Sequence, residues 1–471
     1  MILSTSTTRV RFAPAPSGYL HVGSARSALF NWIYAKKTNG VFILRIEDTN
    51  TELAKPEFYD AITEPLRWLG LEWNEGPHYQ SRRTEKYQAA IQQLLETGFA
   101  YRCDCSREDI DARNKANGFK GGYDGHCRTR ELKDSPNVTI RFKTPKERHV
   151  EIKDAIRGKV VFNTNELEDF IIRRSNGTPV FLVANTVDDA DMGITHVIRG
   201  EDLLNTTPKV KLLWEALGYG DSPQYAHLPL LVGEDKKKLS KRKHSVALGE
   251  FKEMGILPES MINYLALLGW GPDDDKEIRP IEEITDLFTL DGINKAPAYF
   301  DLKKLFHINA EYIRALSPEK FVETALAYFE SISWKPINFD PQVLHDLATH
   351  IQERIEKLAD IANLIEWLFK EELPTETSEK EIKKMTKAMS AERVDDVLDL
   401  AIKQLAECVW DEGTIAEVVN GIGQTLETKS QVPIRIAVTG KRVGLPLFKP
   451  MEILGRQSVL TRLRDARANL T

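Results

Sequence analysis

The chain has 471 residues, too many for one hydrophobic core, and this length predicts about three or more compact units. Hydrophobic residues make up 42% and charged residues 28%, and no window approaches the ~18 consecutive apolar residues that a membrane span requires. The first eight residues lack the pattern of a signal peptide, and the four cysteines form no disulfide framework. These features predict a cytoplasmic protein with no membrane-spanning segment.

The net charge of -6 is not the basic balance that nucleic-acid-binding proteins usually show. One segment departs from this average, because residues 429–467 contain nine basic residues and two acidic ones, a local sum of +7. Such a segment fits either a solvated protein face or a surface for RNA phosphates.

The first hundred residues alternate between β-rich and helical patterns. Residues 9–13 and 41–46 are apolar runs typical of strands, and they flank a helical run at about residues 24–36. A strand, a helix and a second strand in this order predict a βαβ unit and therefore a parallel sheet.

The residues from about 99 to 184 have a different texture. Short β-like pieces such as 137–142 and 159–162 lie between turns of Gly, Asp and Asn, which predicts an inserted domain. Strand and helix patterns resume near residues 180–184 and 195–199, where the second half of the first sheet is expected to begin.

Beyond about residue 245 the pattern becomes helical, with apolar residues at a spacing of three and four. The predicted fold class is therefore α/β plus all-α: an α/β domain split by an insert, followed by a helical assembly.

A candidate anion site lies where the first strand gives way to the first helix. Residues 11–24 read RFAPAPSGYLHVGS, and His21, Gly23 and Ser24 stand at the start of the helix. Backbone N–H groups and the helix dipole favour anions there, and the His21 imidazole can donate to an oxyanion. A lone loop histidine is more often incidental, so the context must decide.

A second candidate site is a dense run of cations. Five of the seven residues from Lys236 to Arg242 are basic, and they follow closely after Gly233. A triphosphate is a natural partner, because such lysines can follow charge as pyrophosphate leaves. The alternative is a solvated turn.

Together the two segments resemble the paired signatures of class I aminoacyl-tRNA synthetases, with HVGS at residues 21–24 and KLSKR at residues 238–242. Residues 11–30, 45–49 (RIEDT) and 194–202 (ITHVIRGED) are similar to the glutamyl and glutaminyl branch. Near the C-terminus, PIRIAVTG at residues 433–440 resembles bacterial glutamyl-tRNA synthetases. The resemblance extends over the whole chain.

The resemblance implies a class I Rossmann-type nucleotide-binding domain split by an α/β insert, followed by helical stem-contact and anticodon-binding domains. The expected ranges are 1–98 and 185–235 for the two catalytic halves, 99–184 for the inserted acceptor-binding domain, 236–322 for the stem-contact domain with the KLSKR loop, and 323–471 for two anticodon-binding subdomains that meet near residue 376.

The implied reaction joins L-glutamate to tRNA-Glu through a glutamyl-adenylate, with ATP and Mg²⁺. The implied catalytic residues are His21, Lys238 and Lys241, and Gly23, Ser24 and Ser240 join them in binding ATP. The family expectation is a monomer. Catalysis then depends on positioning and electrostatic stabilisation, since no covalent enzyme intermediate is required.

Glutamate carries two carboxylates and an ammonium group, so its pocket needs at least two cations and an anion. The resemblance supplies Arg11 and Arg199 for the carboxylates and Glu47 for the ammonium, and structural salt bridges are the rival interpretation of these residues.

Three further positions, Ala13, Phe181 and Asn185, are implied near the substrate. Ala15 and Phe181 depart from the family, which commonly has serine and tyrosine there, so two pocket hydroxyls are missing.

Cys103, Cys105 and Cys127 resemble a zinc site that some family members carry in the inserted domain, and three thiolates suit tetrahedral Zn²⁺. Thr129 stands where some relatives have histidine, which leaves Tyr123, His126 or water as the fourth ligand. Reduced structural thiols are the alternative.

The rival functions are a glutamyl-queuosine type synthetase, a glutaminyl enzyme and a non-catalytic tRNA-binding protein derived from the same fold. The first two are disfavoured by the helical residues 325–471, and retention of the implied site residues disfavours the third. Discrimination between tRNA-Glu and tRNA-Gln depends on anticodon contacts that the sequence does not reveal.

Overall fold

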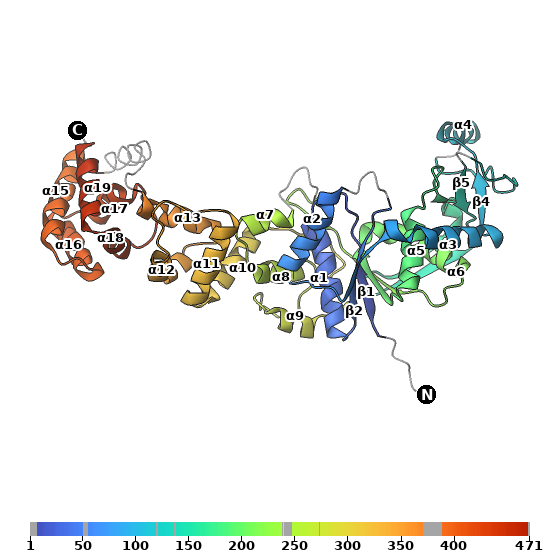
Figure 1. The fold of residues 1–471 in the computed structure, drawn as a ribbon, viewed down its shortest axis with the longest axis horizontal. Helices are drawn as coiled ribbons and strands as arrows, with labels where there is room; N and C mark the ends of the chain where they lie inside the picture. The colour runs from blue at the N-terminus through green and yellow to red at the C-terminus, as the bar shows by residue number, and fades with distance from the viewer. Residues whose placement is uncertain are drawn as a thin grey trace. The chain divides into compact units, whose positions relative to one another are not determined.

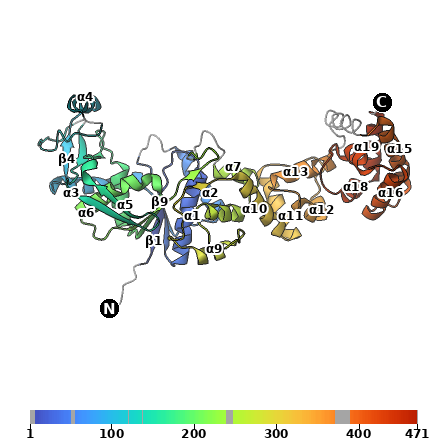
Figure 2. The same ribbon diagram turned by 180° about the vertical axis from the view of Figure 1, so that it is seen from behind.

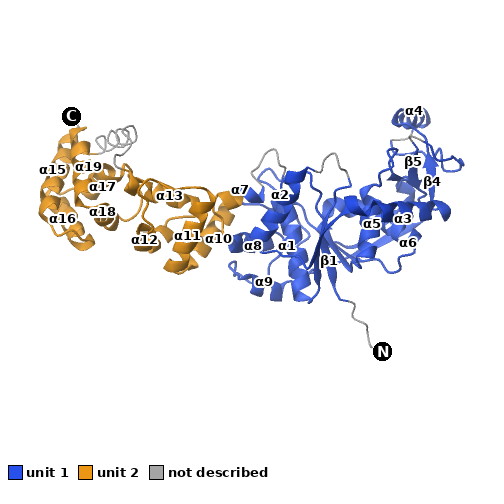
Figure 3. Cartoon of the chain, in the orientation of Figure 1, with its two compact units in different colours: residues 1–250, 258–302 blue, residues 251–257, 303–471 orange. Residues whose placement is uncertain are grey.

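The computed structural model describes residues 7–49, 55–118, 121–135, 138–237, 239, 247–272, 274–370 and 389–469. The chain divides into two compact units, shown in different colours in Figure 3. Unit 1 comprises Met1–Glu250 and Pro258–Leu302, and unit 2 comprises Phe251–Leu257 and Lys303–Thr471. In the described part of the chain, no helix is both long and apolar enough to cross a membrane.

Unit 1 begins with the βαβ arrangement expected from the sequence. Strand β1 (Arg9–Phe12) and strand β2 (Val41–Ile46) pair in parallel, and helix α1 (Val22–Lys37) connects them (Figure 1). Strand β3 (Glu75–Tyr79) extends the sheet in parallel beside β2. Most side chains of β1 and β2 are buried, which explains why both strands are rich in apolar residues, whereas the side chains of β3 are partly or fully exposed. The predicted parallel sheet is confirmed.

A second sheet has the strand order β7-β6-β10-β9. Strands β9 (His196–Gly200) and β10 (Gln224–Leu228) are parallel, whereas β6 (His149–Asp154) and β7 (Gly158–Asn163) form an antiparallel hairpin. The hairpin joins the sheet through β6, which is parallel to β10. The apolar run at residues 180–184 is no strand, because residues 181–184 begin helix α5 (Phe181–Asp191).

The two parallel regions adjoin, since the Thr195 amide donates to the Arg9 carbonyl at 2.9 Å and the Arg9 amide donates to Thr195 Oγ1 at 2.8 Å. This arrangement aligns β1, β2 and β9 so that their carboxyl ends meet on one side.

A third, antiparallel sheet contains β4 (Ala100–Cys103), β5 (Thr139–Phe142) and β8 (Ile171–Arg173). Helix α4 (Arg107–Asn117) follows β4, and Ser106 and Asp109 form a capping box at its start. Figure 2 shows α4 and β4 together in the same part of unit 1.

The remaining elements of unit 1 are helices, 3-10 turns and the two strands of a small parallel sheet. They are α2 (Pro56–Trp68), η1 (Gln80–Arg83), α3 (Thr84–Glu96), η2 (Thr164–Glu166), η3 (Glu201–Thr206), α6 (Thr207–Ala216), β11 (Leu231–Val232), α8 (Pro258–Leu267), α9 (Ile281–Leu287) and β12 (Ala298–Tyr299). Helix α7 (Leu248–Glu253) spans the boundary between the units.

Unit 2 is helical throughout its described residues, as the spacing of apolar residues predicts. Two cores hold it together, one centred on α11 and α12 and one on the helices after residue 390. Its elements are α10 (Leu302–Ala315), α11 (Pro318–Ser331), α12 (Gln342–Gln352), α13 (Ala359–Ile365), η4 (Glu366–Phe369), α15 (Ala391–Glu407), α16 (Glu412–Thr425), α17 (Gln431–Thr439), α18 (Phe448–Leu454) and α19 (Arg456–Ala468).

The basic segment of residues 429–467 is partly structural. Arg462 is buried and donates to the carbonyls of Val438 and Trp367, and Arg435 donates to the carbonyl of Leu445. The local sum of +7 therefore overstates the charge that this segment can offer to RNA.

Candidate active site

A cavity of about 410 Å³ opens where the carboxyl ends of β1, β2 and β9 meet. Ligands of open α/β sheets bind at this edge, because loops and helix N-termini converge there. The cavity is lined by the following predicted site residues: Arg11, Ala13, His21, Gly23, Ser24, Glu47, Phe181, Asn185 and Arg199. Residues 170 or more positions apart in the sequence thus face one space.

The first signature forms the N-terminus of α1 at this cavity. His21 is the N-cap residue, and its Nδ1 accepts hydrogen bonds from the amides of Gly23 at 3.1 Å and Ser24 at 3.3 Å. The ring proton of the neutral imidazole therefore lies on Nε2, which is 3.1 Å from Ser24 Oγ. A Cβ on Gly23 would lie 3.1 Å from His21 Cε1, so glycine lets the imidazole pack against the helix. This end of the helix offers N–H donors to an anion.

Within the second signature the structure describes Leu239, and the next described residue beyond it is Ala247. Leu239 lines the cavity and its amide donates to the Leu231 carbonyl at 3.1 Å. Ala247 forms a bridge with His21 in an antiparallel arrangement. The implied catalytic and ATP-binding residues Lys238, Ser240 and Lys241 lie outside the described residues.

The guanidinium groups of Arg11, Arg26 and Arg199 line the cavity and give it positive charge. Burial, with a further contribution from the charge of Arg11, lowers the pKa of Arg199 to about 10, and Arg199 stays protonated at neutral pH. A carboxylate placed between two such cations relieves their repulsion, and planar guanidinium groups suit it geometrically.

Glu47 follows directly after β2, and its amide donates to the Pro14 carbonyl at 2.9 Å. Burial raises the pKa of Glu47 in spite of the nearby charges of Arg45 and Arg11. It is an acid at the cavity wall that can accept hydrogen bonds from an ammonium group.

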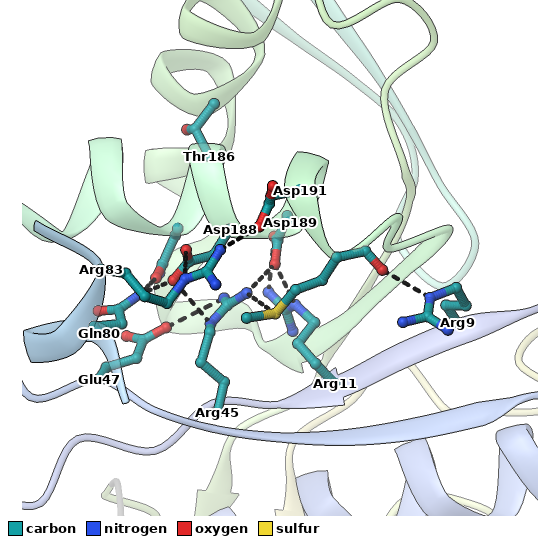
Figure 4. Close-up of polar contacts among 12 residues, drawn as sticks. Arg9, Arg11, Arg45, Glu47, Gln80, Arg83, Thr186, Asp188, Asp189 and Asp191 are labelled. Carbon is teal, nitrogen blue, oxygen red and sulfur yellow. Dashed lines mark hydrogen bonds and ion pairs between the residues drawn. The ribbon is translucent and has the colours of Figure 1, made fainter. Parts of the chain in front are cut away.

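A buried network behind the cavity holds these charges in place (Figure 4). Arg45 is fully buried; its Nη1 is 2.7 Å from Asp189 Oδ1 and its Nη2 is 3.5 Å from Glu47 Oε1. Asp189 also accepts from Arg11 Nε at 3.1 Å. Burial opposes ionisation of Asp189, but the charges of Arg11 and Arg45 hold its pKa below the usual value.

The neighbouring carboxylate, Asp188, joins further elements to the network. Its Oδ1 accepts from Arg83 Nε at 2.7 Å, and its Oδ2 accepts from Tyr87 Oη at 2.8 Å and from Gln80 Nε2 at 3.1 Å. Gln80 Nε2 also donates to Asn185 Oδ1 at 3.0 Å. The network therefore orients the amide of Asn185 at the cavity wall.

The sequence interpretation missed Arg45, Asp188 and Asp189. A signal was present, because Arg45 interrupts an apolar strand and the two aspartates lie within an apolar helix segment. Charges in such runs are buried only with partners.

The two departures from the family pattern both lie at the cavity, since Ala15 and Phe181 line it. The ring of Phe181 is 38% exposed, at the start of α5. An apolar ring thus occupies a position beside polar groups.

A separate cluster of thiols lies beside β4. The Sγ atoms of Cys103, Cys105 and Cys127 lie within 4.8 Å of one another, and those of Cys105 and Cys127 are 3.4 Å apart. Burial and the thiol of Cys127 raise the pKa of Cys105 to about 12, so a thiolate at Cys105 needs a nearby cation. Arg113 and Arg130 each place a guanidinium nitrogen 3.3 Å from a sulfur of the cluster.

The candidate fourth ligands differ in position. Tyr123 is buried and its Oη is 3.4 Å from Cys103 Sγ, whereas His126 and Thr129 are exposed. The donor set fits a tetrahedral Zn²⁺, and the phenol oxygen is the candidate that lies next to the sulfurs.

Comparison with known proteins identifies the class to which this site belongs. Residues 7–307 match the family model of tRNA synthetases class I (E and Q), catalytic domain, and residues 320–467 match that of an anticodon binding domain. The chain therefore belongs to the class I aminoacyl-tRNA synthetases, and both the fold class and this assignment confirm the prediction from the sequence.

Similar full-length proteins narrow the family. The chain is 43% identical to a glutamate–tRNA ligase of Frankia casuarinae over 100% of both chains, and 44% identical to one of Thermobifida fusca over 98% of both. A crystal structure of a glutamate tRNA ligase from Elizabethkingia meningosepticum in complex with its amino acid has a TM-score of 0.84 and 30% identity, covering 99% of this chain and 100% of that one. The chain is a member of the glutamate–tRNA ligase family.

Proposed function

We propose that this protein ligates L-glutamate to tRNA-Glu at the expense of ATP, with Mg²⁺ bound to the nucleotide. The observation that carries the proposal is the convergence of Arg11, Arg199 and Glu47 with the N-terminus of α1 on one cavity. Two carboxylate partners, one ammonium partner and one phosphate site match the groups that glutamate and ATP bring together.

In the first step, an oxygen of the glutamate α-carboxylate attacks the α-phosphorus of ATP, and the bond to the bridging oxygen breaks to release pyrophosphate. The N–H on His21 Nε2, which lies 3.1 Å from Ser24 Oγ, is proposed to donate to a phosphate oxygen when ATP is bound. Lys238 and Lys241 are proposed to supply positive charge to the triphosphate, and Gly23, Ser24 and Ser240 to hold it. Mg²⁺ neutralises phosphate oxygens when it accompanies ATP.

In the second step, the terminal ribose hydroxyl of the tRNA attacks the glutamyl carbonyl carbon, its proton passes to a phosphate oxygen of the adenylate, and AMP leaves with the oxygen that joined it to the glutamyl group. Glutamate is proposed to be held by Arg11 and Arg199 through its carboxylates and by Glu47 through its ammonium group. Ala13, Phe181 and Asn185 are proposed to complete the wall of this pocket. Because these groups hold the reactants in a fixed geometry, less entropy is lost on reaching the transition state, and the activation barrier is lower.

The region around the antiparallel sheet of β4, β5 and β8, called the inserted sheet, is proposed to carry one structural Zn²⁺. Cys103, Cys105 and Cys127 would hold it, with Tyr123 as the fourth ligand. Close approach of the four donor atoms and the guanidinium groups around them support this assignment over reduced thiols. The ion would stabilise the fold of this region, because four ligands leave no open position for substrate.

The test is charging of purified tRNA-Glu and tRNA-Gln transcripts with glutamate and with glutamine, in the presence of ATP and Mg²⁺. Glutamate on tRNA-Glu is the expected product, and the tRNA-Gln arm measures discrimination. Charging with glutamine alone would instead indicate a glutaminyl enzyme, and absence of any charging with tRNA present would indicate a non-catalytic or queuosine-type relative. A monomeric state and a cytoplasmic location stay predictions.

A further inference from the structure

The guanidinium group of Arg199 is held from behind by protein groups. Its Nη2 donates to Thr207 Oγ1 at 2.8 Å and to the Leu203 carbonyl at 3.2 Å, and its Nε donates to His227 Nε2 at 3.2 Å. These contacts involve one edge of the guanidinium plane, while Arg199 also lines the cavity. The orientation of the edge that meets substrate therefore depends on the acceptors behind it.

His227 receives its own orientation from Asp154. The His227 Nδ1 atom is 2.6 Å from Asp154 Oδ2, and both side chains are excluded from solvent. The sheet register fixes this relation, because His227 is the partner of Arg199 between β10 and β9, and β6 carries Asp154 on the other side of β10. Three neighbouring strands thus contribute one member each to a chain of contacts.

The chemistry of this chain of contacts requires one tautomer of His227. Burial opposes ionisation of Asp154, but hydrogen bonds from His227 and from the Arg157 amide hold the pKa of Asp154 below its usual value. An ionised Asp154 accepts the proton on Nδ1, so Nε2 keeps a lone pair that faces Arg199 Nε at 3.2 Å and the Thr207 hydroxyl at 3.1 Å. If the proton lay on Nε2, the N–H group of His227 would point at the N–H group of Arg199 Nε.

The groups around His227 keep the ring neutral. Burial lowers the pKa of His227, and the charges of Arg199 and Arg157 add to this effect against the opposing charge of Asp154. Tyr225 stacks on the ring with centroids 6.1 Å apart and an interplanar angle of 11°. The neutral ring is the form that can accept from Arg199.

We propose that Asp154 and His227 are positioning residues, which hold the guanidinium of Arg199 in the orientation that binds a carboxylate of glutamate. The proposal rests on the proposed function, which assigns Arg199 to the substrate. It predicts that these two buried residues, which do not line the cavity, control the KM for glutamate. If the two residues had a purely structural role, their substitution would lower stability and would raise the KM for ATP as much as the KM for glutamate.

Two matched substitutions separate these roles. The amide oxygen of His227→Gln can occupy the position of Nε2 and accept from Arg199, whereas the shorter side chain of His227→Asn reaches only the position of Nδ1. In full-length enzyme assayed with tRNA-Glu, His227→Asn is expected to raise the KM for glutamate ~10-fold or more, as loss of a hydrogen bond to a charged group predicts, and His227→Gln to restore most of it. The KM for ATP should stay near the wild-type value in both.

A second comparison tests the tautomer. Asp154→Asn presents an amide N–H to Nδ1, which favours a proton on Nε2 and turns it away from Arg199 as an acceptor, so the KM for glutamate should rise ~10-fold. Because glutamine has no tautomers, the double variant Asp154→Asn/His227→Gln should have a lower KM than Asp154→Asn alone. This comparison holds even if His227→Asn fails to fold, which thermal melting would reveal.

Each outcome is decisive. Equal KM values for the asparagine and glutamine variants, or equal rises in the KM for glutamate and ATP, would overturn the positioning role. Arg199→Ala separates this proposal from the proposed function: if it raises the KM for glutamate while the Asp154 and His227 variants do not, only the positioning role fails. If Arg199→Ala leaves that KM unchanged, the assignment of Arg199 to glutamate fails as well.

Discussion

Arg45 and Asp189 form an ion pair of 2.7 Å between Nη1 and Oδ1, with both side chains almost completely shielded from solvent. Because Asp189 also accepts from Arg11, the pair links the interior of unit 1 to the wall of the cavity. Breaking a buried pair by removing one charge costs more than the pair itself contributes, since the remaining charge is left without compensation.

Asp189→Asn should therefore destabilise unit 1 by about 3–5 kcal/mol and raise the KM for glutamate by releasing Arg11. Asp191→Asn is the matched control, because Asp191 lies on the same helix and its more exposed carboxylate pairs with Lys86 and Arg83, where the loss should stay well below that of Asp189→Asn. Urea unfolding and glutamate kinetics measure the two effects. Equal losses in the two variants would contradict a special role for the buried pair.

The same pair predicts a dependence of stability on pH. The folded-state pKa of Asp189 is lowered, so its contribution is fully present above the unfolded pKa of about 3.9 and is lost as pH falls through the folded value. The difference in urea midpoint between the wild-type protein and Asp189→Asn should therefore narrow as pH is lowered from 7 to below 4. A difference that is constant over this range would show that charge is not the cause.

The sequence predicted those site residues that belong to continuous motifs. His21 and Gly23 follow from a strand–loop–helix pattern, whereas Arg11 and Arg199 were implied by the family resemblance. It did not predict the partners behind them, because Arg45 and Asp189 are 144 positions apart and meet only through the sheet.

Strand pairing within the predicted insert was also not predictable from the sequence. The sequence of the β6–β7 hairpin resembles the rest of the insert, yet β6 pairs with β10 of the second sheet. The sequence of one short strand does not specify which strand it pairs with.

The thiol cluster predicts a metal content of one Zn²⁺ per chain. Cys127→Ser should lose the metal and lower the thermal stability of the inserted sheet, because binding to structural sites is coupled to folding. Cys408→Ser is the matched control, since Cys408 lies at the end of α15, far from the cluster in sequence. Elemental analysis after dialysis measures both.

The identity of the fourth ligand has its own comparison. Tyr123→Phe should weaken zinc retention in a chelator competition, and His126→Ala should not, because Tyr123 is buried against Cys103 and His126 is exposed. The opposite order would assign the ligand to histidine, and no metal in the wild-type protein would favour plain thiols.

The departure at Phe181 predicts a gain rather than a loss. Phe181→Tyr places a hydroxyl at the cavity, and one neutral hydrogen bond is worth about 0.5–1.5 kcal/mol, so the KM for glutamate should fall ~2- to 10-fold. Phe99→Tyr is the matched control, because Phe99 is similarly exposed but does not line the cavity. An unchanged KM for Phe181→Tyr would show that the hydroxyl finds no partner on the substrate.

The KLSKR segment supplies the last prediction. If Lys241 stabilises charge on the departing pyrophosphate, Lys241→Ala should slow glutamate-dependent ATP–pyrophosphate exchange ~100-fold or more, the loss typical of one oxyanion donor. The assay contains tRNA-Glu, so that both variants are compared in the presence of the proposed RNA substrate. Lys236→Ala is the matched control, since it removes a charge from the same run of cations at a position to which no role is assigned. Near-normal exchange by Lys241→Ala would remove this lysine from the mechanism, whereas equal losses in the two variants would indicate a general effect of positive charge on nucleotide binding.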